Sequence, residues 1–142
     1  MQYNLPNSDG AGWTPIDATN LKFATSPAAG NYSYAITGNA DLWTANPGFN
    51  QDVGIFISGG VYGSGTLVAW KESGGFAGTF SPNAAYVETL QHLQGGVTYT
   101  LWLAWKTNRQ GAGSTIFAAA GPLPATTSFS PTRLTATLLS SP

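Results

Sequence analysis

Apolar and polar residues alternate with a period of two between Val97 and Lys106. This alternation is typical of a β-strand, whose successive side chains point to opposite faces of a sheet. One face carries Val97, Tyr99, Leu101, Leu103 and Trp105. The other carries Thr98, Thr100, Trp102, Ala104 and Lys106. Because an indole lies among small and polar neighbours on the second face, we predict two buried surfaces. The first is an intramolecular core, and the second contacts a partner, another subunit or a ligand.

Similar short segments recur along the chain and are separated by glycine and proline clusters about every ten residues, the spacing of an all-β sandwich or barrel. No segment has the period of an amphipathic helix. The predicted strands cover residues 13–16, 21–25, 31–37 with a continuation to 43, 52–58, 66–72, 86–93, 97–106, 115–119 and 129–139.

These eight to ten strands predict an all-β fold, an antiparallel β-sandwich of the jelly-roll type. The connections are too short for the helical crossovers that parallel strands need, which favours antiparallel pairing. A chain of 142 residues is long enough to bury a core as one domain. We predict that residues 1–12 form an N-terminal arm or linker and that residues 13–142 form the single sandwich.

Composition narrows the classes of partner. Only 8% of residues are charged, the net charge is −1, and the five basic residues are scattered. Nucleic acids and anionic membrane surfaces need clustered Lys and Arg, so neither is expected as a partner. No apolar run approaches the roughly 20 residues of a membrane span, so no membrane insertion is expected. The chain has no cysteine, which excludes disulfides and thiolate metal sites.

No motif with catalytic spacing is present. His92 is the single histidine, and no Gly-x-Ser-x-Gly nucleophile elbow occurs. The six acidic residues show no pattern that pairs them for glycoside hydrolysis or resembles an EF-hand loop. A calcium ion shared by Asp41 and Asp52 is an alternative to a simple hydrogen-bonded turn. We therefore expect a protein that is not an enzyme and that has no cofactor or metal.

The five tryptophans are the best lead to a binding site. Trp105 is in phase with the core face of its strand. Trp43 is close in sequence to amide and carboxylate side chains, and a sugar ring stacks on an aromatic face while its hydroxyls bond to a polar rim. The predicted glycan site consists of Trp43, Asn46, Asn50, Gln51 and Asp52. The alternative is that Trp43 covers the end of the sandwich.

Three segments resemble the tumour-necrosis-factor-like jelly roll, a family that includes complement-type globular heads and bacterial and phage trimeric tips. Residues 30–36 read GNYSYAI and are similar to the family's Gly-x-Tyr-aromatic strand. Residues 93–101 read LQGGVTYTL and are similar to the entry into its long late strand. Residues 129–139 read FSPTRLTATLL and are similar to its closing strand.

The resemblance implies a homotrimer packed around a threefold axis through an aromatic and small-residue face. Trp102 with Ala104, or Phe117 with Ala119, are the candidates for that face. We expect a non-enzymatic head domain at an extracellular, cell-surface or virion surface. It would trimerise and bind a glycan or protein receptor through its loops. Two alternatives stay open: a monomeric carbohydrate-binding module or lectin, and a purely structural capsid, spike or matrix domain.

Overall fold

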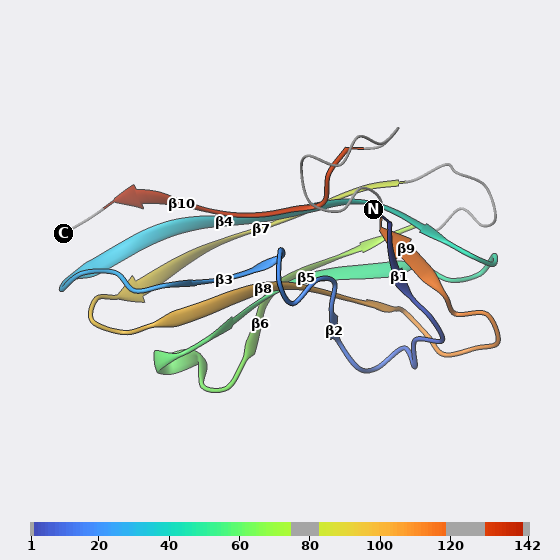
Figure 1. The fold of residues 1–142 in the computed structure, drawn as a ribbon, viewed down its shortest axis with the longest axis horizontal. Coiled ribbons are helices and arrows are strands. Elements are labelled where there is room, and N and C mark those ends of the chain that lie inside the picture. The colour runs from blue at the N-terminus through green and yellow to red at the C-terminus, as the bar shows by residue number, and fades with distance from the viewer. Residues whose placement is uncertain (1, 75–82, 119–129, 141–142) are drawn as a thin grey trace.

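The computed structural model describes residues 2–74, 83–118 and 130–140, which contain ten strands and one short 3-10 helix at Gly60–Tyr62 (Figure 1). The strands are β1 (Tyr3–Leu5), β2 (Thr14–Pro15), β3 (Lys22–Thr25), β4 (Asn31–Thr44), β5 (Gln51–Ser58), β6 (Thr66–Ser73), β7 (Asn83–Gln94), β8 (Tyr99–Thr107), β9 (Ile116–Ala118) and β10 (Arg133–Ser140). All their pairings are antiparallel. The predicted β-sandwich is confirmed.

Two sheets form the layers of the sandwich. The first sheet contains β1, β9, β4, β10 and β7, and the second contains β2, β3, β8, β5 and β6. In the first sheet, β4 pairs with β7 along one edge and with both β9 and β10 along the other. In Figure 1, β10, β4 and β7 form the upper layer, and β3, β8, β5 and β6 form the lower one.

Strands β9 and β10 are two parts of one line along β4. Ala118 at the end of β9 lies opposite Leu42, and Arg133 at the start of β10 lies opposite Asn39. Both parts run antiparallel to β4, and the segment 119–132 separates them in sequence. We letter the strands by taking β1 as A, β3 to β8 as B to G, and β9 with β10 as one last strand H. The first sheet then has the order A-H-C-F and the second the order B-G-D-E. This is the strand order of a jelly roll.

The core lies between the inner faces of the two sheets. On β8 the predicted apolar face is confirmed, because Tyr99, Leu101, Leu103 and Trp105 are all exposed by 2% or less. Burial of such side chains stabilises the fold by about 1.5–3 kcal/mol each. The other fully buried core side chains are Ile36, Leu42, Val53, Ile55, Ile57, Leu93, Ile116 and Ala118.

Part of the predicted N-terminal arm belongs to the sandwich. Tyr3–Leu5 forms β1, which pairs with β9, and the Tyr3 side chain is buried in the core. The Tyr3 hydroxyl donates a hydrogen bond to Asp17, 3.0 Å away. Three residues are too few to display a period of two, so the pattern of the sequence could not reveal this strand.

Candidate binding face on the outer side of the second sheet

The outer face of the second sheet carries an aromatic cluster of Trp13, Phe56, Trp70 and Trp102. Trp102 of β8 lies opposite Phe56 of β5, and the two rings stack with centroids 5.3 Å apart and planes 13° apart. Trp13, just before β2, meets Phe56 edge-on at 5.7 Å and Trp70 of β6 edge-on at 6.4 Å. Trp70 is 53% exposed. The cluster therefore joins residues from four segments of the chain into one surface feature.

Two glycines position the indoles of this cluster. Gly54 of β5 lies between Ala104 and Trp70 in the ladder, and a Cβ atom there would be 3.0 Å from the Trp13 ring. A Cβ atom at Gly65 would be 2.8 Å from Cη2 of Trp102. The 2.8 Å at Gly65 is shorter than real Cβ contacts, and the 3.0 Å at Gly54 is tighter than most of them; a Cβ at Gly54 would also be 2.7 Å from Cδ1 of Leu67. Glycine at both positions therefore lets the rings lie close against the backbone.

A buried ion pair fixes the segment that carries Trp13. The Lys106 ammonium is 2.6 Å from Oδ2 of Asp52, its neighbour in the β5–β8 ladder, and the side chains are 16% and 2% exposed. Lys106 also donates to the carbonyls of Gly10 and Thr107, each at 3.3 Å. The ammonium lies 5.4 Å from the centroid of the Trp13 ring, within the range of a cation–π contact. One lysine thus ties the chain at 10–13 to the sheet.

A tight turn leads into Trp13. The Asp9 carboxylate accepts the backbone N–H groups of Ala11 and Gly12 at 2.8 and 2.7 Å. These bonds, first from Gly12 and then from Ala11, lower the pKa of Asp9. The turn therefore keeps its carboxylate ionised and its geometry defined at neutral pH.

A groove of about 440 Å³ opens on the aromatic cluster, and we call it the tryptophan groove. Trp102, Phe56 and Trp13 give it aromatic walls, while hydroxyl groups and one ammonium form its polar rim. In the part of the chain that the structure describes, Lys22 has no ion-pair partner. The lining residues are Trp13, Pro15, Lys22, Phe56, Ser58, Ser64, Thr100 and Trp102.

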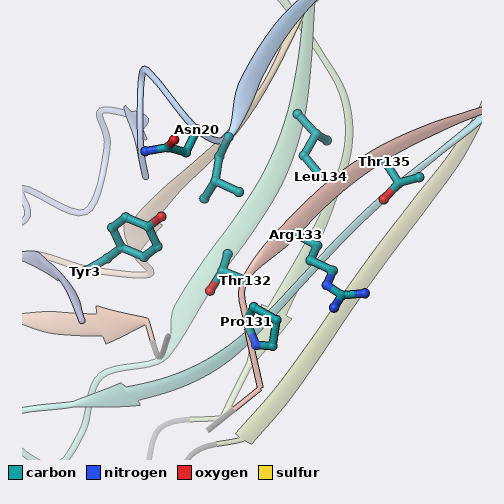
Figure 2. Close-up of a pocket in the computed structure, with 8 residues that line it drawn as sticks. Tyr3, Asn20, Pro131, Thr132, Arg133, Leu134 and Thr135 are labelled. Atoms are coloured by element: carbon teal, nitrogen blue, oxygen red, sulfur yellow. The ribbon is translucent and has the colours of Figure 1, made fainter. Parts of the chain in front are cut away.

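A second hollow, of about 220 Å³, lies at the start of β10. Figure 2 shows Tyr3 and Asn20 across this hollow from Pro131 and Thr132. The Tyr3 hydroxyl donates to Asp17, and burial together with this bond raises the pKa of Tyr3. Its phenol is already hydrogen-bonded within the chain, and the hollow has one aromatic side chain where the tryptophan groove has three.

Asp17, which accepts the hydrogen bond from the Tyr3 hydroxyl, is held by several donors. Burial alone would raise the pKa of Asp17, but hydrogen bonds from Asn20, Thr19 and Tyr3 outweigh it and lower the pKa. The backbone N–H groups of Thr19 and Asn20 both donate to Oδ1 at 2.8 Å. Asp17 therefore stabilises the turn between β2 and β3 and connects it to β1.

The structure does not bring the predicted glycan site together. Trp43 is only 5% exposed and stacks on Phe117, with centroids 5.5 Å apart, on the outer side of the first sheet. Gln51 is fully buried between the sheets. With its amide oriented to satisfy both neighbours, it donates to the Ser73 carbonyl and accepts the Thr44 N–H, each at 3.1 Å. Trp43 is thus a packed side chain, and the alternative interpretation, that it covers the end of the sandwich, stays a prediction.

The other members of that predicted site bond to groups of the chain itself. The Asn46 amide donates to the Gly113 carbonyl at 3.2 Å, and the Asn50 amide donates to the Glu72 carboxylate. Asp52 is on the outer face of the second sheet, because consecutive residues of a strand point to opposite faces. Glycan binding at Trp43 therefore stays a prediction, and the buried ring gives it no open stacking surface.

The predicted subunit contacts fall on two different sheets. Trp102 is half-buried on the outer face of the second sheet, but Ala104 beside it is fully buried within the chain. Phe117 is half-buried on the first sheet, and Ala119 lies outside the described residues. Of these four residues, Trp102 and Phe117 are the two whose side chains the structure shows as partly exposed. A subunit contact at either residue stays a prediction.

The described ranges contain one serine–histidine contact and no cluster of metal-binding side chains. Ser33 and His92 lie opposite one another on β4 and β7, with Oγ and Nδ1 2.9 Å apart on an exposed face. Across residues 2–74, 83–118 and 130–140, no three His, Cys, Asp or Glu side chains gather where they could hold a metal ion. Within the same ranges, no helix has the length and apolar character needed to cross a bilayer.

Comparison with known proteins gives only distant likenesses. No family model and no curated protein matches the chain. A structure of infectious bursal disease virus, Gt strain, has 16% identity and a TM-score of 0.45 over 83% of this chain and 28% of that one. A Gx strain structure has 15% identity and a TM-score of 0.29 over 85% and 37%.

The VP2 subviral particle of the same virus has 14% identity and a TM-score of 0.26, over 83% of this chain and 36% of that one. This chain therefore spans less than two fifths of each of these proteins. The jelly-roll assignment follows from the order of the chain's own strands.

Proposed function

We propose that this chain is a non-enzymatic structural domain that builds an assembly at a virion, particle or cell surface by associating with copies of itself. The trimer implied by the resemblance to tumour-necrosis-factor-like heads is the proposed stoichiometry. The observation that carries the proposal is the outer edge of β10, which is unpaired among the described residues and lies beside exposed leucines.

The β10 edge is suited to a contact between chains. Residues of β10 pair with β4 on one side, while β1 pairs only with β9, so no described strand pairs with the other side of β10. An unpaired edge presents backbone N–H and C=O groups to another chain, and proteins that stay monomeric shield such edges with charge, proline or brevity. β10 has eight residues, and its one charged side chain, Arg133, is at its start.

Apolar side chains accompany this edge. Leu138 and Leu139 near the end of β10 are 49% and 58% exposed, and Leu90 of β7 is 56% exposed. Ala35 of β4 pairs with Leu90 on one side and with Thr137 on the other, so these leucines border the same sheet. Covering them on association is favourable at about 25 cal/mol per Å² of apolar surface. A closed ring would cover every copy of the edge and leave none open for further growth.

Sedimentation velocity on edge variants tests this proposal. Leu139→Lys places a charge at the proposed contact, whereas Val61→Lys places the same charge on the 3-10 helix, at a residue that is 88% exposed. We expect the wild type and Val61→Lys to sediment as the same oligomer and Leu139→Lys to sediment as a smaller species. The same sedimentation coefficient for all three proteins would contradict a contact at β10.

A further inference from the structure

We propose that the tryptophan groove binds an acidic glycan, an oligosaccharide that carries a carboxylate on a sugar ring. The groove is on the second sheet, whereas the β10 edge is on the first. The inference therefore does not depend on self-association, and each can fail without the other.

The walls of the groove provide stacking surfaces. Trp102 is half-buried and is backed by Phe56, whose ring is nearly parallel to it at 5.3 Å. Trp13 meets Phe56 edge-on at 5.7 Å, so two indoles border the same groove. The C–H face of a pyranose ring is apolar and packs on an aromatic ring, which makes such walls suitable for a sugar.

The two indoles are held in place before any ligand arrives. Gly65 allows Trp102 to lie close against its backbone, and Gly54 allows Trp13 to rest on the sheet. Lys106, which is paired with the buried Asp52, also contacts the Trp13 ring, with its ammonium 5.4 Å from the ring centroid. A preformed site loses little conformational entropy on binding, and this lowers the free-energy cost of capturing a flexible oligosaccharide.

Hydroxyl groups form one side of the rim. Ser58 of β5 and Thr100 of β8 lie opposite one another in the row next to Phe56 and Trp102, and Ser64 comes from the β5–β6 connection. A hydroxyl both donates and accepts hydrogen bonds, as do the hydroxyls of a sugar. The volume of about 440 Å³ is within the range of small-ligand sites, which is about 300–1,000 Å³.

The charge of the groove selects among sugars. Lys22 of β3 lies opposite Trp102 in the ladder, is exposed, and has no ion-pair partner among the described residues. The other lysine on this face, Lys106, is paired with Asp52. The groove thus has one uncompensated positive charge beside its main stacking ring. A carboxylate would make a charge-assisted hydrogen bond with it, which a neutral sugar cannot do.

Titration of the full chain with 3′-sialyllactose, a hyaluronan tetrasaccharide and lactose tests the proposal, with intrinsic tryptophan fluorescence as the readout. We expect saturable quenching by at least one acidic probe and affinity for it at least tenfold above that for lactose. The Lys22→Gln variant should lose about tenfold in affinity for the acidic probe, the effect of one charge-assisted hydrogen bond. Lys71→Gln, which removes an exposed lysine of β6, is the matched control and should bind as the wild type does.

Several results would overturn the proposal. They are equal affinity for the acidic probe and lactose, no saturable binding of either acidic probe, and unchanged affinity in Lys22→Gln. Tryptophan emission that responds to chain concentration but to no probe would assign the groove to a contact between copies instead. Trp102→Ala should abolish binding, and because Lys22→Gln alters only an exposed side chain, the test does not depend on the fold of the tryptophan variant.

Discussion

Replacing Lys106 with Met would leave the Asp52 carboxylate buried without its partner. The Asp52 side chain is 2% exposed, and its Oδ1 has no hydrogen-bond partner among the described residues, so the 2.6 Å contact of Oδ2 with Lys106 is its main compensation. Removing one member of a buried pair costs about 3–5 kcal/mol, whereas exposed pairs contribute about 0–1 kcal/mol. Because Lys106 keeps 16% exposure, water can reach part of the site. We therefore expect a loss near the lower end, about 3 kcal/mol in the free energy of unfolding.

Guanidinium unfolding at pH 7, followed by tryptophan fluorescence at one fixed chain concentration, measures this loss. A fixed concentration is needed because self-association makes apparent stability depend on it. Lys71→Met is the control and should change stability by less than about 0.5 kcal/mol. The double variant Asp52→Asn with Lys106→Met should recover much of the loss, since no charge is then left buried. A loss below about 1 kcal/mol in Lys106→Met, or no recovery in the double variant, would refute this account of the pair.

Three further predictions concern stability. The folded-state pKa of Asp17 is lowered, so its contribution to stability is full above the unfolded pKa of about 3.9 and is lost as pH falls from there through the lowered folded-state pKa. Asp17→Asn should therefore cost about 1 kcal/mol at pH 7 and less at pH 3 in thermal unfolding; an equal cost at both pH values would contradict this. Gly54→Ala should cost about 1–3 kcal/mol and shift the emission of Trp13, while Gly74→Ala, where a Cβ meets nothing within 4 Å, should be nearly neutral in chemical denaturation. Trp43→Ala should cost about 3–5 kcal/mol by calorimetry because the Trp43 ring is buried. A loss of stability as small as that in Trp70→Ala, where the ring is exposed, would argue against a packing role for Trp43.

The strands of the sandwich could be predicted because each packs one face against the core, so that apolar and polar residues alternate along the strand. β8 illustrates this, since its inward residues Tyr99, Leu101, Leu103 and Trp105 are all buried, although Ala104 of the other face is buried as well. The three-residue β1 was missed because it is shorter than any period that a pattern can show. The closing strand predicted over 129–139 corresponds to β10, which begins at Arg133. β9 pairs with the same side of β4 as β10 does.

The candidate site was predictable only in part. The sequence placed Trp102 on a second face that needed a partner, and the aromatic cluster covers that face. It could not show that Trp13 lies there or that Asp52 meets Lys106, because those two residues are 54 positions apart. Alternation assigns a residue to a face of its strand but does not say which strand lies beside it.

The residues grouped around Trp43 are not all on one surface, for a related reason. The prediction grouped residues by nearness in sequence, yet Gln51 and Asp52 are consecutive in β5 and point to opposite sides of the sheet. Gly54 was the better signal, since a glycine inside a strand often marks the close approach of another group. Here the Leu67 side chain and the Trp13 ring both approach it.

Light scattering coupled to size exclusion, over a range of concentrations, gives the solution mass of the wild-type chain and so tests its self-association directly. We predict a mass near three times the 14.7 kDa of one chain, maintained on dilution. A mass of one chain at every concentration would contradict the proposal that this jelly-roll domain builds an assembly from copies of itself.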